Sequence, residues 1–216
     1  MKKKGIALVE RQYLFPFVLI TSLFFLWGFA HAILDVLNKH FQELLTITRT
    51  HSAMIQATMY MGYFIMAIPA GLFINRHGYR KGVVLGLLLY GIGSLLFIPG
   101  QYIASFNMFL FSLFVIGCGL TFLETAANPY VTELGARETA ASRLNFAQSF
   151  NGLGCIFAPI LTGLLLFSDE DKGASGNVAL PYAVMGVIVL LAALAFMRVR
   201  LPEIPHEEEV TVKAIA

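Results

Sequence analysis

Apolar residues gather along this chain in six long runs that short polar connections separate. The runs are Leu14–Leu37, Ser52–Ile74, Gly82–Pro99, Phe106–Tyr130, Leu144–Phe167 and Leu180–Met197. A helix rises about 1.5 Å per residue, so about 20 apolar residues cross the hydrocarbon core of a bilayer. The pattern therefore predicts an all-α polytopic membrane protein in which residues 14–200 form a bundle of six transmembrane helices.

The two ends of the chain differ from this apolar middle. Residues 1–13 are predicted to form a short cytoplasmic N-terminus, and residues 201–216, with the acidic run Glu207–Glu209, a solvated cytoplasmic linker or tail. The basic start and the small residues in Ala30–Ala32 also resemble a secretory signal peptide. Because the first apolar run is longer than the roughly 7–15 residues of such a signal, we interpret it as a span.

The composition agrees with a chain whose solvent is lipid. It is 57% hydrophobic and 13% charged, with a mean hydropathy of +0.73, whereas soluble domains carry about 25% charged residues. The net charge of +2 is too small to indicate nucleic-acid binding. Cys118 and Cys155 lie inside apolar runs without the spacing of a metal site, so we expect two small buried side chains there.

Lysine and arginine are distributed unevenly between the connections. With the N-terminus inside, the cytoplasmic set is Lys2, Lys3, Lys4, Arg11, Arg76, Arg80, Lys81, Arg137, Arg143, Arg198, Arg200 and Lys213. The outer set is only Lys39, Arg49 and Lys172. Because cytoplasmic loops carry the excess of these residues, both termini are predicted to be cytoplasmic.

Motifs of soluble enzymes are absent from the sequence. It contains no P-loop, no His-Glu-x-x-His pattern, no nucleophile elbow and no glycine fingerprint after a strand. We therefore expect no enzyme activity. The glycines Gly82, Gly86, Gly117 and Gly119 are expected to serve close helix packing instead.

Glu124 is a carboxylate inside an apolar run, where a charge costs at least about 2.5–3.5 kcal/mol. Asn128 and Thr121 lie on the same helix face. Pro129 lacks an N–H, which leaves the Thr125 carbonyl free to face a ligand or water. Because desolvation disfavours the charged form, Glu124 is expected to load and release a proton near neutral pH. The alternative is a neutral Glu124 that hydrogen-bonds only within the bundle.

A second carboxylate, Asp35, lies near the outer end of the first run. His31, Asp35 and Asn38 follow one another at i, i+4 and i+7, so they form one polar stripe. We predict a role for Asp35 in handling a proton or a substrate. The alternative is a carboxylate that simply reaches water at the interface.

Two other runs carry uncharged polar stripes. These are Gln56, Tyr60 and Tyr63 on the second run, and Asn145, Gln148, Asn151 and Gly152 on the fifth. Amides and hydroxyls suit a polyhydroxylated ligand, and a tyrosine ring can stack on the apolar face of a sugar. The alternative for each stripe is interhelical hydrogen bonding, worth about 0.6 kcal/mol per contact in membranes.

The segment between the second and third runs carries a further pattern. Its marked positions are Gly71, Asn75, Arg76, Gly78, Arg80 and Lys81. The pattern resembles the signature loop of the major facilitator superfamily, in which a glycine and an acidic residue precede Gly-x-Arg-Lys. Asn75 stands here at the acidic position.

Other segments resemble the L-fucose permease group of that superfamily, the fucose/galactose/glucose:proton symporters. They are Leu23–Gly28 leading to Asp35, Met59–Ile65 followed by Pro69–Gly71, Leu123–Val131 and Arg143–Asn151. The likeness runs from about Phe15 to Pro202, and the segment around Glu124 is specific to this group.

The resemblance implies proton-driven uptake of a hexose or deoxyhexose across the bacterial inner membrane, with protons as the coupling ion and no cofactor. It implies that Glu124 and Asp35 are the key acids, Glu124 chiefly for proton coupling and Asp35 for sugar hydroxyls. Members of the group often have asparagine just before the aspartate, where this chain has Leu34. The preference among fucose, galactose and glucose therefore stays open.

Members of this superfamily have twelve spans in two halves with the substrate between them. We therefore expect this chain to be the amino-terminal half and to need a second six-helix half. A truncated sequence, one piece of a split transporter and a homodimer would each account for its length. The alternative function is a non-transporting remnant or regulatory half that pairs with another membrane protein; a channel or membrane enzyme would need a constellation that the sequence lacks.

Overall fold

The computed structural model describes residues 7–44, 49–103, 105–167 and 179–199, and the regular elements among these residues are all helices. The elements are η1 (Arg11–Tyr13), α1 (Leu14–Leu44), α2 (Arg49–His77), α3 (Tyr79–Leu95), α4 (Phe97–Tyr102), α5 (Phe106–Glu133), η2 (Arg137–Thr139), α6 (Ala140–Phe167) and α7 (Ala179–Arg198). The predicted all-α fold is confirmed, and five of the six predicted runs each lie within one long helix. The third run, Gly82–Pro99, extends beyond the end of α3 into α4.

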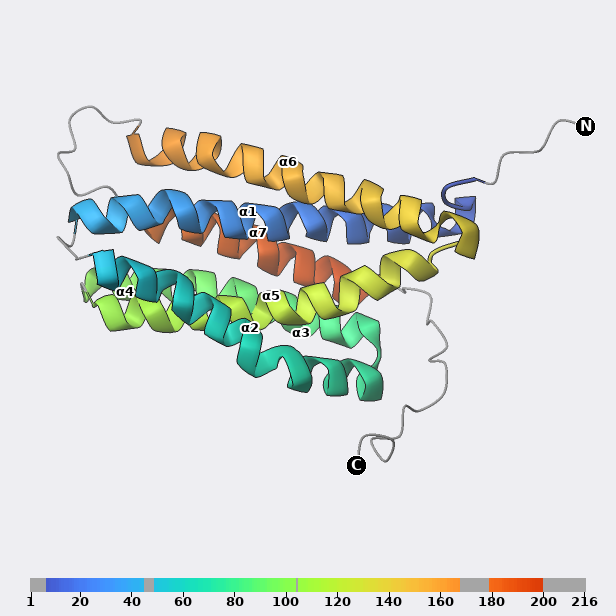
Figure 1. Cartoon of the computed structure of the whole chain (residues 1–216), viewed down its shortest axis with the longest axis horizontal. Coiled ribbons are helices and arrows are strands. Elements are labelled where there is room, and N and C mark those ends of the chain that lie inside the picture. The colour runs from blue at the N-terminus through green and yellow to red at the C-terminus, as the bar shows by residue number, and fades with distance from the viewer. Residues whose placement is uncertain (1–6, 45–48, 104, 168–178, 200–216) are drawn as a thin grey trace, which may run out of the picture.

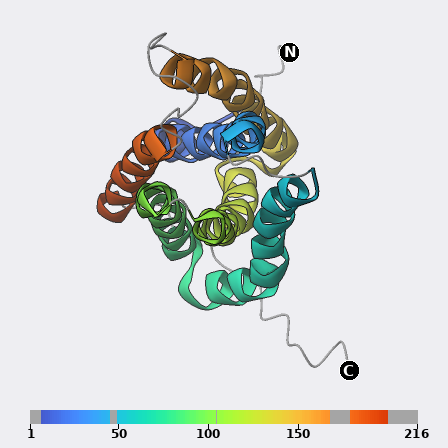
Figure 2. The same cartoon turned by 90° about the vertical axis from the view of Figure 1, so that its left-hand side faces the viewer.

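The long helices lie side by side along the long axis of the molecule (Figure 1). The most extensive packing joins α1 to α6, α3 to α5, α2 to α5 and α3 to α7. Figure 2 looks along the bundle and shows α6 and α2 on opposite sides of it, with α1 and α5 between them. Helices α1 and α5 therefore form the centre of the fold.

Length and apolarity identify five membrane-spanning candidates in the described part of the chain. They are Arg11–Val36, Ala53–His77, Tyr79–Tyr102, Phe106–Glu133 and Ala179–Arg198. The sixth predicted span is α6, whose 28 residues reach about 42 Å and so are long enough. Its amide side chains, Asn145, Gln148 and Asn151, reduce its mean hydropathy. The number of long helices in the described part of the chain thus agrees with the prediction, whereas the combined criterion of length and apolarity identifies five of the six spans.

Large apolar side chains cover much of the outer surface. On α2, Phe64 is 84% exposed and Ile68 is 74% exposed. Leu164 of α6 and Leu191 of α7 are exposed as well. Surfaces of this kind are stable only against lipid or against another protein, which agrees with a membrane-embedded bundle.

Glycines allow the helix axes to approach closely in the interior. A Cβ atom on Gly117 of α5 would lie 2.3 Å from the carbonyl oxygen of Met59 on α2, and one on Gly86 of α3 would lie 2.8 Å from that of Gly119. A Cβ atom on Gly82 would meet the Ile74 side chain at 2.5 Å. The predicted packing role of these glycines is confirmed.

The segment Gly71–Lys81, which resembles the signature loop, is helical on both sides of a one-residue turn. Residues 71–77 complete α2, Gly78 alone is non-helical at φ 86°, and α3 begins at Tyr79. A residue with positive φ reverses the chain in one step, which glycine does without steric cost. Pro99, the end of the third predicted run, lies with Gly100 in α4, where a proline in the first turn costs no helical hydrogen bond.

Two arginines hydrogen-bond to carbonyl oxygens at helix ends, on the side of the bundle where Gly78 and Gly135 lie. Arg80 donates through Nε to the Phe196 carbonyl oxygen at 3.2 Å, and through its second amino group to that of Met197, so it caps the end of α7. Arg143 is fully buried. It donates to carbonyl oxygens of Val131, Thr132, Ala136 and Leu8 and to the Thr139 hydroxyl. Arg80, a position of the signature pattern, therefore holds the end of α7, whereas the buried hydrogen bonds of Arg143 were not predicted from the sequence pattern.

Candidate functional site

An open pocket of about 710 Å³ lies between α2 and α5. Its lining residues are Tyr60, Tyr63, Phe64, Ala67, Thr121, Glu124, Thr125, Asn128 and Pro129. Four of these stand at i, i+3, i+4 and i+7 on α2, from Tyr60 to Ala67, so they share one helix face. The other five come from the last half of α5. The pocket combines aromatic rings on one wall with a carboxylate, an amide and hydroxyls on the other.

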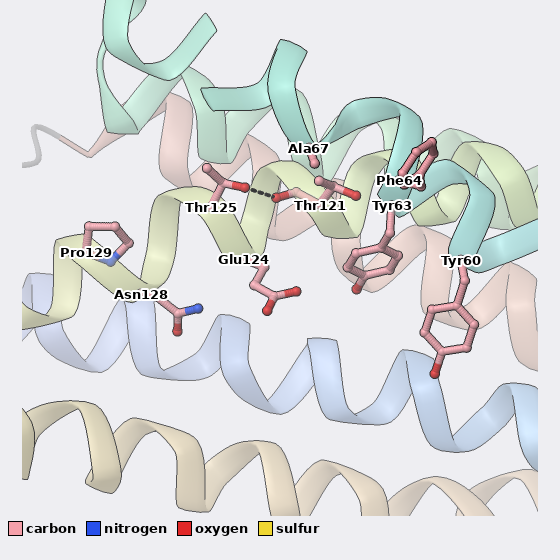
Figure 3. A pocket seen from close by; sticks show the side chains of 9 residues that line it. All are labelled: Tyr60, Tyr63, Phe64, Ala67, Thr121, Glu124, Thr125, Asn128 and Pro129. Atoms are coloured by element: carbon pink, nitrogen blue, oxygen red, sulfur yellow. Dashed lines mark hydrogen bonds between the residues drawn. The ribbon is translucent and has the colours of Figure 1, made fainter. Parts of the chain in front are cut away.

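Glu124 is half-buried in this pocket. Figure 3 shows its carboxylate pointing toward α1, on the same side as the Asn128 amide and the hydroxyls of Tyr60 and Tyr63. Within the described part of the chain this carboxylate has no hydrogen-bond or ion-pair partner. A carboxyl group that is half-buried and has no such partner can bind either a proton or a ligand hydroxyl.

The threonines of α5 are occupied with their own helix. Thr121 Oγ1 donates to the Gly117 carbonyl oxygen at 2.8 Å, and Thr125 Oγ1 donates to that of Thr121 at 2.7 Å. Such back-bonding satisfies both hydroxyl hydrogens in an apolar helix. Asn128 is held differently, because Gln148 Nε2 of α6 donates to its Oδ1 at 3.4 Å. The amide of Asn128 therefore keeps its N–H donors for the pocket.

A second group of polar residues joins α1 to α2. Gln56 Nε2 donates to Asp35 Oδ1 at 3.1 Å, and Trp27 Nε1 donates to Tyr63 Oη at 3.0 Å. His31 lies one turn before Asp35 and one turn after Trp27. Its Nε2 atom is 3.5 Å from Tyr63 Oη. Tyr63 therefore belongs both to this group and to the pocket wall, and it connects the two.

The structure thus brings together most, but not all, of the side chains predicted as site residues. Tyr60, Tyr63, Glu124 and Asn128 line the pocket. Asp35, Gln56 and Gln148 contact one another or the pocket residues through the bonds described above. Asn145 and Asn151 belong neither to the pocket lining nor to these bonds, and the side chain of Asn38 lies outside the described residues. Any ligand role of the predicted residues stays a prediction.

Phe64, Ala67 and Trp27 are site residues that sequence reasoning missed. Extending the tyrosine stripe of α2 by one helical turn identifies Phe64 and Ala67 from their spacing alone. Trp27 has no such signal, because its partner Tyr63 is 36 residues away on another helix.

Comparison with known proteins gives a consistent result. The model of the Major Facilitator Superfamily matches residues 17–215. An L-fucose-proton symporter of Haemophilus influenzae is 38% identical over 93% of this chain and 52% of its own length. A glucose/galactose transporter of Brucella abortus is 37% identical over 92% of this chain and 49% of its own length. The chain therefore spans about half the length of the curated relatives it matches.

Comparison with solved structures gives the same family. The crystal structure of FucP, a Major Facilitator Superfamily transporter in the outward conformation, is 37% identical over 95% of this chain and 54% of that chain, with a TM-score of 0.78. A D-xylose-proton symporter has a TM-score of 0.74 over 88% of this chain and 49% of that chain. At 16% identity this second likeness concerns the fold alone.

Proposed function

This chain belongs to the Major Facilitator Superfamily, and on that premise we propose that it forms the amino-terminal half of a transporter that takes up a monosaccharide together with a proton. The observation that carries the proposal is the half-buried Glu124 carboxylate, which has no partner among the described residues and lies in a pocket of aromatic, amide and hydroxyl side chains. No metal or cofactor enters the scheme, because protonation of a carboxyl group supplies the coupling.

The pocket has the chemistry that a sugar requires. The rings of Tyr60, Tyr63 and Phe64 offer flat apolar surfaces for the C–H face of a pyranose, and Asn128 offers N–H donors for its hydroxyls. Glu124 accepts a hydrogen bond when ionised and donates one when protonated. The affinity for the sugar thus depends on whether the proton is bound, which is the basis of coupling.

Asp35 is assigned to sugar hydroxyls and to proton coupling as the second acid. Gln56 orients its carboxylate through one oxygen, so the other oxygen stays available to a ligand. The relatives that the chain resembles carry names of L-fucose and of glucose/galactose transport. We therefore place the substrate among hexoses and 6-deoxyhexoses without choosing one.

The pocket is open and only the described α2 and α5 line it. A second six-helix half would close it, because the substrate of this superfamily binds between two halves. That half is a separate chain, a second copy of this chain or the remainder of a longer one. The second candidate function, a non-transporting half that pairs with another membrane protein, follows from the same open pocket.

Uptake by cells tests the proposal. Transporter-deficient cells expressing these 216 residues are given labelled fucose, galactose and glucose, and parallel cells express the chain joined to the carboxyl-terminal half of the L-fucose-proton symporter of Escherichia coli. We expect the joined protein to accumulate at least one sugar and an uncoupler to abolish accumulation. Accumulation by the chain alone identifies a self-sufficient half. No accumulation in either, with both proteins in the membrane, supports the non-transporting half.

The proposed setting is the bacterial inner membrane with both termini in the cytoplasm. The excess of lysine and arginine near Gly78, Gly135 and Arg198 supports this orientation. Green fluorescent protein joined after Ala216 should fluoresce, and alkaline phosphatase at the same place should be inactive. The reverse pair of results would place the C-terminus outside.

A further inference from the structure

His31 is the only described histidine in contact with a pocket residue, and the proposed function leaves it without a role. It is half-buried on α1, between Trp27 and Asp35. Its ring lies 6.0 Å from the Trp27 ring and 5.9 Å from the Tyr63 ring, measured between centroids. Imidazole changes its charge between about pH 5 and 8, so a histidine at this position can bind a proton under conditions that cells meet.

The hydrogen bonds around His31 determine which of its nitrogens carries the hydrogen. Nδ1 lies 3.1 Å from the Trp27 carbonyl oxygen, which can only accept, so Nδ1 is the donor. In the neutral ring Nε2 is then an acceptor, and it faces Tyr63 Oη at 3.5 Å. Tyr63 Oη already accepts the indole N–H of Trp27 at 3.0 Å. Its own hydrogen is thus free to turn toward His31 Nε2.

Protonation of Nε2 reverses this arrangement. The imidazolium has a hydrogen on both nitrogens, so Nε2 becomes a donor toward Tyr63 Oη. The two lone pairs of Oη then receive Trp27 and His31, and the hydroxyl hydrogen of Tyr63 must turn away from both. Tyr63 lines the pocket beside Glu124, so the pocket gains one donor.

We infer that His31 is a positioning residue that couples proton binding to ligand binding, by setting whether the Tyr63 hydroxyl donates to the imidazole or into the pocket. This inference rests on the proposed function for the nature of the ligand. One proton from solvent adds to Nε2 and later leaves it; no other bond forms or breaks.

Other groups around His31 that titrate or carry charge are few in the described part of the chain. Asp35 on α1 acts on it electrostatically, as Glu124 and Tyr60 act on Tyr63. Tyr182 of α7 interacts with Asp35. From α6, which packs along α1, the described cation Arg143 lies at the other end of the helix, bound to carbonyl oxygens. Glu124 is therefore the main rival to His31 as the site of a proton sensed by Tyr63.

The test uses the one tryptophan of the chain as its reporter. Because a protonated imidazole quenches a neighbouring indole, we expect Trp27 emission of the full chain in detergent to fall as the pH is lowered from about 8 to 5. His31→Gln and His31→Asn, which keep a polar side chain but bind no proton, should both lose this transition. His77→Gln is the matched control, because His77 Nδ1 makes the same contact, 3.1 Å to the Phe73 carbonyl oxygen, far from Trp27.

Tyr63→Phe tests the second step. It should keep the emission transition but lose the pH dependence of sugar affinity, which in the parent we expect to rise about threefold to tenfold on protonation, the equivalent of one hydrogen bond. Circular dichroism shows whether each variant is folded. Two different His31 substitutions are used so that the test can still be made if one of these variants does not fold.

Two results would overturn the inference. The first is an emission transition that persists in both His31 variants. The second is a transition that disappears in Glu124→Gln but persists in the His31 variants. The emission transition needs no sugar. A parent that titrates through His31 but binds no monosaccharide, either alone or joined to the carboxyl-terminal half, would therefore count against the proposed function and not against the proton site.

Discussion

Replacing Glu124 with glutamine is expected to abolish sugar accumulation while leaving sugar exchange across the membrane intact. Glutamine has the shape of a protonated glutamate and can still donate to a ligand, but it cannot release a proton. Each proton that enters across a potential of 100 mV supplies about 2.3 kcal/mol, enough for an accumulation of about 50-fold. In the variant the ratio of internal to external sugar should fall to about one, because nothing links the sugar to the gradient.

The matched control is Glu133→Gln on the same helix. Glu133 is exposed at the end of α5 and does not line the pocket, so its loss should leave accumulation unchanged. Accumulation is measured with labelled sugar in energised cells, and exchange with de-energised vesicles preloaded with unlabelled sugar. If Glu124→Gln accumulates sugar as well as the parent, the proton is carried elsewhere. If exchange is lost as well, Glu124 is needed for binding and its coupling role is not separable.

The helices were predictable because lipid imposes a length and an apolar composition on each of them. The last run, Leu180–Met197, differs from α7 by one residue at each end. The ends of other helices were not predictable in this way. α1 continues to Leu44 and α2 begins at Arg49, through polar residues that lie beyond the apolar run. Hydropathy reports where the hydrocarbon ends, whereas a helix ends where its hydrogen bonds end.

The site was predictable within one helix and not between helices. Thr121, Glu124 and Asn128 were expected on one face because helix geometry is periodic, and all three line the pocket. The same reasoning placed Asn145 and Asn151 beside Gln148, yet only Gln148 reaches α5. Which residue of a polar stripe contacts a neighbouring helix depends on the angle at which the two helix axes cross. This crossing angle cannot be derived from a single sequence.

The buried Arg143 is a second example of contacts between separate segments that a local sequence pattern does not predict. Arg143 was expected only as one of the cytoplasmic cations, but the structure buries it completely. Its bond to the Leu8 carbonyl oxygen joins residues 135 positions apart. A buried guanidinium is stable only when its donors are satisfied, and the carbonyl oxygens that satisfy them come from two separate segments of the chain, residues 131–136 and Leu8. No local pattern marks such a residue in advance.

Replacing Gly154 with alanine is expected to disrupt the bundle and therefore to lose both stability and function. A Cβ atom at Gly154 of α6 would lie 2.2 Å from the Phe25 carbonyl oxygen of α1 and 2.8 Å from the Phe29 amide nitrogen. Gly28 makes the reciprocal approach, with a Cβ position 2.0 Å from the Asn151 carbonyl oxygen. The obstacles are backbone atoms, which cannot rotate away as a side chain can. Overpacking of this kind costs about 1–3 kcal/mol or more.

The consequence reaches the site, because α1 carries Trp27, His31 and Asp35. Moving α1 away from α6 by even a fraction of an ångström changes the distance between Trp27 and Tyr63 on α2. We therefore expect Gly154→Ala to lower the thermal unfolding temperature in detergent and to reduce sugar binding together. Gly152→Ala, two residues along the same helix, is the control, because no atom lies within 4 Å of its Cβ position. Equal unfolding temperatures for the two variants would mean that α1 and α6 do not pack at this separation, and the geometry of the α1 residues would then need a different support.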